Sequence, residues 1–274
     1  MSTVHDVAKA GFGTGTNELY DRARPSYPPE ALEFMRSNLS QSKTPLSVVE
    51  IGSGTGIFTR ALLAHPAWKV LVQTLRAVEP SEGMRSVFLQ KTQDPRVSCD
   101  EGTFTQTNES DESADVLFIA QAFHWAHPNY DEAMKEIARV LKPDGVAFFI
   151  WNMEDRQTGW VAKVRDLYEA YEEDTPQFRL NKWEAAFQTP SYLSHFDAPV
   201  RFETEWHVPT TITGVQERVL SKSYITQIPP EAKSKLAEEI EATLRESEKA
   251  WIQEEAGIFE YPYKTTVIAM KKSN

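Results

Sequence analysis

The stretch Val48–Gly56 constrains the fold more than any other part of this 274-residue chain. An apolar run of β-branched residues surrounds Glu50, glycines follow at positions 52, 54 and 56, and a helical pattern begins at Ile57. Glycine allows positive φ and lets a ligand touch the main chain. A strand, a glycine turn and a helix N-terminus hold nucleotide-like cofactors at the C-terminal edge of a parallel sheet, so we expect an α/β fold with such a site.

The spacing of the glycines favours one class of cofactor. A dinucleotide fingerprint is G-x-G-x-x-G, and its third glycine would fall at Ile57. Glu50 would repel a pyrophosphate but can meet a cationic amino-acid tail. S-adenosylmethionine (SAM) carries such a tail and no phosphate. The loop is therefore interpreted as a SAM site, and glycines that only form a tight turn are the alternative.

A second acid follows the next predicted strand. Glu79 lies 29 positions after Glu50 and ends the run Leu75–Val78. In this fold class an acid at the tip of the second strand accepts hydrogen bonds from both ribose hydroxyls. The alternative is a solvated carboxylate before a helix that begins with Ser81 as its N-cap. With the glycine loop upstream, the ribose contact is the favoured interpretation.

Strand and helix patterns alternate through the rest of the chain. Up to residue 152 we expect a strand and a turn within 97–104, strands at 114–120 and 146–151, and a helix at 132–141. After it, helices are expected at 160–173 and 229–255, and strands at 200–208 and 263–270. This alternation predicts a parallel sheet with helices against it.

Composition excludes several classes of protein. A net charge of −11 disfavours nucleic acid, because an acidic protein repels phosphate backbones. No apolar run approaches twenty residues and no signal-peptide pattern is present, so we expect a cytoplasmic protein without a membrane partner, and a monomer. Cys99 is the only cysteine, and the histidines are scattered, so neither a disulfide nor a metal site is expected.

The chain resembles the class I SAM-dependent methyltransferases, and within them a fungal small-molecule subgroup that includes trans-aconitate methyltransferase-like enzymes. The motifs that carry the resemblance cover roughly residues 17 to 152 and are Tyr20–Pro28, Glu50–Gly56, Glu79–Ser81, Gln121–Trp125 and Arg139–Gly145. Together with Ala10–Thr16, the whole chain looks most like thiomethyltransferases that act on dithiol secondary metabolites such as reduced gliotoxin.

The resemblance implies a doubly wound, mostly parallel seven-stranded sheet with an antiparallel last strand and an inserted helical cap. It implies a single domain, 1–274, whose parts are an N-terminal lid and helix (1–40), a SAM-binding core (45–151), the cap (152–200) and C-terminal strands with a helix (201–274).

The family's cofactor contacts carry over residue by residue. Those around the amino-acid end of SAM are Glu50, Gly52, Gly54, Thr55, Ala120 and Gln121. Those around the ribose and adenine are Glu79, Met84, Thr103 and Phe104, and those of the lid are Tyr20 and Arg24. The family often has an Asp where this chain has Thr103, so adenine recognition is expected to depend on the Phe104 backbone N–H.

His124 is the candidate catalytic residue, because it follows the fourth strand, where the acceptor should meet the methyl group. It is either a general base or a residue that only shapes the pocket. The residues expected to contact the acceptor are Tyr27, Phe123, Trp125, Trp151 and Asn152.

The expected activity is methylation of a small molecule, with a dithiol as the first acceptor. A small polyacid remains the alternative, and Arg22, Arg24, Arg156 and Arg179 are candidates to bind its carboxylates. A nucleotide-cofactor oxidoreductase and a non-catalytic SAM-fold binder also remain open. An ionised thiol needs no strong base, whereas an aliphatic hydroxyl would need one.

Overall fold

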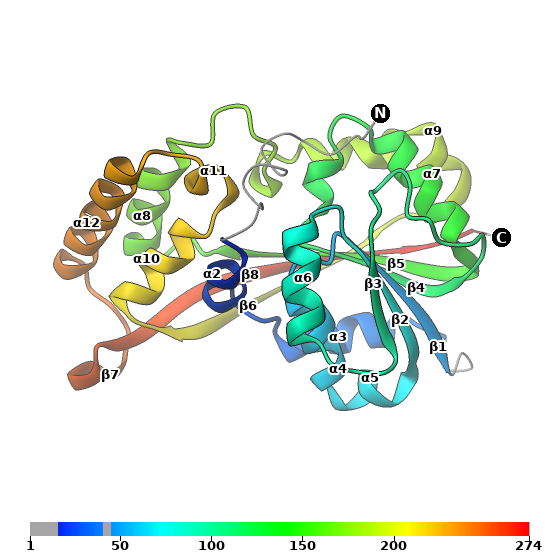
Figure 1. Ribbon diagram of the computed structural model, residues 1–274, viewed down its shortest axis with the longest axis horizontal. Coiled ribbons are helices and arrows are strands. Elements are labelled where there is room, and N and C mark those ends of the chain that lie inside the picture. The colour runs from blue at the N-terminus through cyan, green and yellow to red at the C-terminus, as the bar shows by residue number, and fades with distance from the viewer. Residues whose placement is uncertain (1–15, 41–44, 274) are drawn as a thin grey trace.

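An eight-stranded sheet is the centre of the protein in a computed structural model that describes residues 16–40 and 45–273 (Figure 1). The strand order is β3-β2-β1-β4-β5-β8-β6, and β7 pairs with β8. The strands are β1 (Leu46–Ile51), β2 (Val72–Val78), β3 (Val97–Asp100), β4 (Ala114–Ala120), β5 (Leu141–Glu154), β6 (Val200–Thr210), β7 (Trp251–Gln253) and β8 (Ile258–Lys271).

Strand directions confirm the predicted fold class. The pairs β1–β2, β1–β4, β2–β3 and β4–β5 are parallel, and β8 runs antiparallel to β5, β6 and β7. The order reverses between β1 and β4, which is the switch point where cofactors bind in open α/β sheets. The sequence predicted seven strands, and the eighth is the three-residue β7, which was not foreseen.

Helices cover both faces of the parallel strands (Figure 1). The helices and 3-10 helices up to residue 140 are α2 (Asn17–Ala23), α3 (Pro29–Ser37), α4 (Ile57–Ala64), α5 (Pro66–Leu71), α6 (Glu82–Lys91), η1 (Phe123–Ala126) and α7 (Tyr130–Val140). Those beyond residue 154 are α8 (Gly159–Glu169), η2 (Phe178–Leu180), η3 (Lys182–Gln188), α9 (Pro190–His195), α10 (Ile212–Leu220), α11 (Ser223–Thr226), α12 (Pro230–Glu246) and η4 (Glu254–Ala256).

The apolar patterns account for these elements. In β1, Val48 faces the core that α3, α4 and α5 share, while Val49 faces the core that α7 completes. A strand buried on both faces reads as a continuous apolar run. Along α7, buried side chains recur at helical spacing and include Ala133, Met134 and Ile137.

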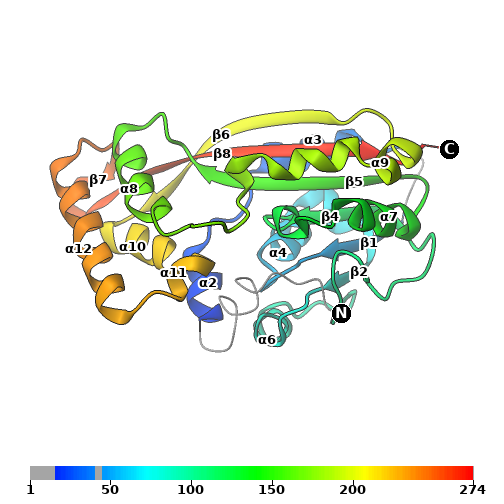
Figure 2. The ribbon, with the colours of Figure 1, turned by 90° about the horizontal axis from the view of Figure 1, so that it is seen from above.

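Residues 152–200, expected as one cap, divide between two cores. The helix α8 packs with α10, α11 and α12 against the extended end of β8, where Phe259, Tyr261 and Tyr263 are buried. By contrast, Trp183 of η3 and Tyr192 of α9 belong to the core beside α7. Figure 2 shows the first group beyond the parallel strands and α9 alongside β5. The helix α8 of the expected cap therefore packs with helices that come from residues 201–274.

The predicted helix 229–255 is too long at its C-terminal end. The helix α12 ends at Glu246, and Ser247 is extended (ψ 145°). Trp251 and Ile252 then form β7, because an aromatic and a β-branched residue favour strand pairing, here with β8.

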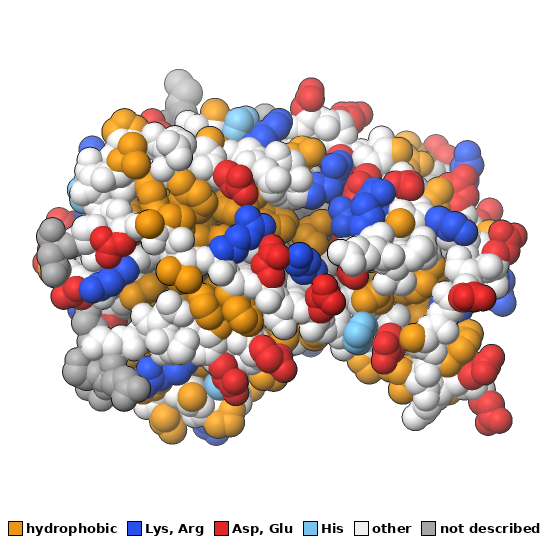
Figure 3. Space-filling model, turned by 180° about the vertical axis from the view of Figure 1, so that it is seen from behind, with side chains coloured by type: hydrophobic (Ala, Val, Ile, Leu, Met, Phe, Trp, Pro, Cys, Tyr) orange, Lys and Arg blue, Asp and Glu red, His pale blue; other side chains and the backbone are white. Residues whose placement is uncertain are grey.

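Acidic and basic side chains are interspersed on the face shown in Figure 3. Within residues 16–40 and 45–273, no helix has the length and apolar character needed to cross a bilayer. Over the same residues, no three His, Cys, Asp or Glu side chains come together as a metal site would require.

Candidate active site

The glycine loop turns tightly at the C-terminal end of β1. All three loop glycines have positive φ: 70° at Gly52, 56° at Gly54 and 86° at Gly56. The N–H of Gly52 donates to the Val78 carbonyl at 2.7 Å, which ties the loop to the end of β2. A Cβ on Gly52 would lie 2.8 Å from Ala122 Cβ, whereas one on Gly54 would meet only Met84 Sδ, at 3.4 Å. Gly52 is therefore required because Ala122 packs against it. Gly54 has open space beside it, where a ligand can approach the main chain.

Glu79 spans the loop and the start of α6. Its Oε2 accepts the Gly54 N–H and its Oε1 accepts the Ser81 N–H, both at 2.9 Å. Burial raises the pKa of Glu79, and the two N–H donors oppose that rise. Ser81 is the N-cap of α6, as the alternative interpretation required, because its hydroxyl accepts the Met84 N–H. Each Glu79 oxygen keeps a lone pair for a further donor, so the capping serine and a ribose contact are compatible.

Glu50 is completely buried beside the loop. The Thr59 hydroxyl donates to its Oε2, and its Oε1 has no hydrogen-bond partner among the described residues. Burial raises the pKa of Glu50 to about 8, although the Thr59 hydrogen bond and the Arg60 charge oppose the rise. A buried oxygen without a donor is costly, so this atom fits a ligand that brings a cationic N–H group.

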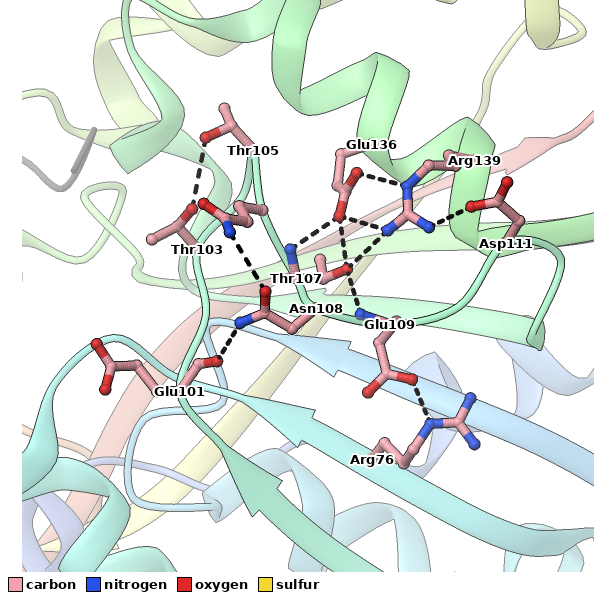
Figure 4. A network of polar contacts seen from close by, with 11 residues as sticks. Arg76, Glu101, Thr103, Thr105, Thr107, Asn108, Glu109, Asp111, Glu136 and Arg139 are labelled. Atoms are coloured by element: carbon pink, nitrogen blue, oxygen red, sulfur yellow. Dashed lines mark hydrogen bonds and ion pairs between the residues drawn. The ribbon is translucent and has the colours of Figure 1, made fainter. Parts of the chain in front are cut away.

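The segment expected to flank the adenine is held against α7 (Figure 4). The Thr107 N–H and hydroxyl donate to Glu136 Oε1 at 2.8 and 2.6 Å. Arg139 holds the same carboxylate at 2.7 Å and pairs with Asp111. The Thr103 hydroxyl lies 3.4 Å from that of Thr105 in a short bridged turn that follows the end of β3 at Asp100, so residues 97–104 form a strand and a turn as predicted.

Gln121 and Asn152 join the ends of β4 and β5. Gln121 has a positive φ of 56°, and its side-chain amide exchanges two hydrogen bonds with the Asn152 main chain, at 2.9 and 3.0 Å. The Asn152 side chain donates to the Ser26 carbonyl and accepts from the Thr265 hydroxyl. These hydrogen bonds fix the orientation of both amides and leave each side-chain NH2 a second N–H for the ligand contacts expected of them.

Two adjoining pockets open along this sheet edge. The first, beside the glycine loop, is lined by Tyr20, Arg24, Pro25, Tyr27, Glu50, Gly52, Ser53, Gly54, Thr55, Ile57, Phe58, Ala120 and Gln121. We call it the cofactor pocket. The second, which we call the acceptor pocket, is lined by Tyr20, Arg24, Gln121, His124, Trp125, Trp151, Asn152, Met153, Tyr168, Glu169, Glu172, Gln177, Phe178, Arg179, Arg218, Lys222, Ser223 and Tyr224. Tyr20, Arg24 and Gln121 line both.

His124 has little capacity to act as a base. Its Nδ1 lies 3.3 Å from Trp151 Nε1, and an indole N–H can only donate, so Nδ1 is the acceptor and the neutral ring carries its proton on Nε2. Burial and then the Arg24 charge lower the pKa of His124 to about 3. A neutral ring whose remaining nitrogen carries a hydrogen cannot accept a proton there, which favours the pocket-shaping interpretation.

Several candidate residues lie elsewhere than expected. Phe123 is fully buried and stacks on Phe149 at 4.1 Å, and it lines neither pocket. Tyr27 lines the cofactor pocket rather than the acceptor pocket, since it packs edge-on against Phe58 at 5.1 Å. Met84 is buried next to Gly54, and residues 10–15 of the N-terminal motif lie outside the described residues.

The arginines proposed for a polyacid separate into two groups. Arg22 pairs with Glu217 and Arg156 pairs with Asp166, and both arginines are exposed. Arg24 and Arg179 do line the acceptor pocket.

Sequence reasoning missed Arg218 and Lys222, the buried cations of the acceptor pocket. A signal was present, because Arg218 lies between Val215 and Val219 on the apolar face of α10. A charged residue at a core position indicates a buried ion pair or a ligand site.

The fold and this site match one group of known proteins. A family model described as a methyltransferase domain matches residues 49–149. An uncharacterised methyltransferase-like protein of Schizosaccharomyces pombe is 32% identical over 224 residues, covering 81% of each chain. An uncharacterised methyltransferase of Mycobacterium bovis is 29% identical over 233 residues, covering 85% of each chain.

Solved structures show the same fold at lower identity. The YcgJ protein of Bacillus subtilis aligns with a TM-score of 0.54 at 19% identity, over 89% of this chain and 99% of that one. A phosphoethanolamine N-methyltransferase of Haemonchus contortus in complex with SAM aligns with a TM-score of 0.56 at 15% identity, over 100% of this chain and 60% of that one.

The chain belongs to the class I SAM-dependent methyltransferases. The cofactor is SAM, and the residues beside the glycine loop fit it, because Glu50 offers an unpaired buried oxygen and Gly54 leaves its side of the pocket bare. These features give no support to the oxidoreductase alternative.

If Glu79 holds the ribose, Glu79→Ala should weaken SAM binding by about 2–4 kcal/mol, because two charge-assisted hydrogen bonds are lost. Glu79→Gln should lose less. Calorimetry with SAM and with a 2′-deoxy analogue of SAM checks the assignment. The wild type should bind the analogue more weakly than SAM, whereas Glu79→Ala should bind the two ligands with nearly equal affinity. An equal penalty for the missing hydroxyl in both proteins would place Glu79 away from the ribose.

Proposed function

We propose that the protein transfers the methyl group of SAM to a small molecule that attacks through an anionic atom, and that its acceptor is a thiol of a dithiol secondary metabolite such as reduced gliotoxin. One observation carries this proposal: the acceptor pocket is lined by four cations (Arg24, Arg179, Arg218 and Lys222) against two carboxylates (Glu169 and Glu172), while the histidine in it has its acceptor nitrogen engaged. A site of this kind stabilises an anion better than it deprotonates a hydroxyl.

SAM supplies a methyl group on a positively charged sulfur, and transfer is an in-line displacement, so positioning provides much of the catalysis. A thiol with a pKa near 8.5 is a few per cent ionised at neutral pH, and a nearby cation increases that fraction. Trp151 and Phe178 stack at 4.6 Å along one wall of the acceptor pocket and suit a flat apolar molecule.

The charge of the same pocket supports a second candidate, carboxyl O-methylation of a small polyacid such as trans-aconitate. A carboxylate is already ionised and needs no base, and Arg24, Arg218 and Lys222 offer charged donors. The phosphoethanolamine N-methyltransferase aligned above is, by its name, also an enzyme of a small molecule, which fits either candidate.

Incubation of the protein with SAM and a panel of dithiols, carboxylic acids and alcohols, followed by mass spectrometry, tests the proposal. We expect one or two methyl groups on reduced dithiols. Methylation of trans-aconitate or a related acid with none on any thiol would move the assignment to the carboxyl candidate. No methyl transfer despite SAM binding would indicate a non-catalytic binder.

His124→Ala should keep substantial activity toward a thiol, within roughly tenfold of the wild type, because no proton passes through the ring. Trp151→Phe is a useful companion variant, since it removes the indole donor that fixes the ring while keeping an aromatic side chain. A loss of several orders of magnitude in His124→Ala that persists across pH would contradict this and indicate a hydroxyl acceptor with His124 as its base.

A further inference from the structure

A buried cluster of charges forms one wall of the acceptor pocket. At its centre is Glu154, at the end of β5, with 1% of its surface exposed. Its Oε1 lies 2.7 Å from Arg218 Nη2 and 3.4 Å from Lys222 Nζ, and its Oε2 accepts from the Tyr168 hydroxyl at 3.3 Å. Burial alone would raise the pKa of Glu154, but the charges of Arg218 and Lys222 lower it well below its ordinary range, so Glu154 is an anion.

The cluster holds more cations than anions. Arg165 pairs with Glu169 at 2.7 Å, and Arg179 pairs with Glu172. Arg218 and Lys222 are then left to share the one carboxylate of Glu154, and Arg24, which donates to Ser221, adds a third positive charge nearby.

Among these cations only the lysine can adjust its charge, because a guanidinium does not lose its proton in proteins. Burial lowers the pKa of Lys222 most, Glu154 opposes that shift, and the charges of Arg218, Arg24 and Arg165 add to it, so that the pKa is about 7. Its ammonium group also lies 4.3 Å from the centre of the Tyr168 ring, which favours the charged form. The cluster therefore holds an amine that gains and loses its proton near neutrality.

Lys222 is placed where an acceptor would bind. It follows α10, and its side chain lines the acceptor pocket together with Gln121 and His124, the residues just past β4. Because His124 already uses Nδ1 to accept a hydrogen bond, it leaves the proton-accepting role to another group.

We propose that the uncharged amine of Lys222 takes the proton of the acceptor thiol. The inference rests on the proposed function. The S–H bond breaks and an N–H bond forms on Lys222, which leaves a thiolate beside an ammonium and two guanidinium groups. A sulfur lone pair of the acceptor then forms the new S–C bond while the methyl–sulfonium bond of SAM breaks and its electrons stay on the donor sulfur. The ammonium afterwards returns its proton to water.

Rates as a function of pH test this role. In the wild type, kcat for a dithiol should rise through about pH 7 and then level off. Lys222→Met should lose on the order of 100-fold at pH 7, as expected for removal of a general base, and should recover as the pH approaches that of free thiol ionisation. Lys222→Arg keeps the charge but cannot take a proton, so it should lose about as much.

Lys249→Met is the matched control, because Lys249 also lies over an aromatic ring, that of Trp251 at 5.2 Å, and it does not line the acceptor pocket. It should leave kcat and its pH profile unchanged. SAM affinity measured by calorimetry should be the same in all variants, which shows that each is folded. A Lys222→Arg variant with wild-type rate and pH profile would overturn the proposal, since Lys222 would then act only as a fixed charge.

A second measurement does not depend on turnover. The rate at which an amine-specific acylating reagent labels Lys222, followed by peptide mass spectrometry, should reach half its maximum near pH 7, well below the ordinary range of a lysine amine. Labelling of Lys222 that begins only near pH 10 would overturn the base role even if thiols are methylated. Labelling near pH 7 with no thiol turned over would overturn the proposed function, and the base role with it.

Discussion

Replacing Gly54 by valine should abolish SAM binding, with a loss of affinity of at least 100-fold, or about 3 kcal/mol. Gly54 lines the cofactor pocket, and a Cβ there would meet only Met84 Sδ, at 3.4 Å, so the larger side chain would occupy the space of the ligand. The protein should still fold, because the main cost is a residue with a side chain at φ 56°, roughly 1–2 kcal/mol or somewhat more for a β-branched residue. Calorimetry with SAM measures the result.

Gly257→Val separates backbone strain from ligand contact. Gly257 has a φ of 68°, and a Cβ there would meet nothing within 4 Å. This variant should therefore lose a similar amount of stability while binding SAM as the wild type does. Unchanged SAM affinity in a folded Gly54→Val protein would mean that the loop does not hold the cofactor.

Glu50→Gln should make the protein relatively more stable at high pH while weakening SAM binding. Burial raises the pKa of Glu50 to about 8, above the value of about 4.5 expected for the unfolded chain. The stability that the buried acid contributes is thus fully present below pH 4.5 and is lost as the pH rises through about 8. Glutamine does not titrate. The unfolding free energy of Glu50→Gln, taken relative to that of the wild type, should therefore rise by about 2–3 kcal/mol between pH 6 and pH 9.

Urea unfolding at the two pH values measures this difference, and Glu246→Gln at the exposed end of α12 is the control that should show none. The same variant should lose SAM affinity, because a neutral amide cannot balance an ammonium group. In the wild type, SAM binding near pH 7 should release protons from Glu50, which calorimetry in buffers of different ionisation enthalpy detects. A pH-independent stability difference between Glu50→Gln and wild type would show that Glu50 is ionised in the folded protein.

The parallel core was predictable because it depends on local signals. The apolar run around Val48, the glycines after it and the helical spacing in α7 each specify an element without reference to the rest of the chain. Glu50 and Glu79 could be placed beside the glycine loop because they occupy fixed positions relative to the first two strands.

The acceptor pocket was less predictable because it is assembled from distant parts of the chain. Lys222 reaches Glu154 only because the long antiparallel strands β6 and β8 extend past the parallel strands and carry α10 there. The partner of His124 is likewise a residue of the adjacent strand, Trp151. Nothing in the spacing of His124 indicates that its Nδ1 would be engaged.

Arg24 of the segment after α2 has a consequence for the order of events in a catalytic cycle. It lines both pockets and also donates to the side chain and the carbonyl of Ser221, at 2.9 and 3.0 Å. If α2 moves outward to admit SAM, these bonds break and both pockets open together. For the proposed dithiol acceptor, we then expect the singly methylated product to leave with the spent cofactor and to accumulate before the doubly methylated one.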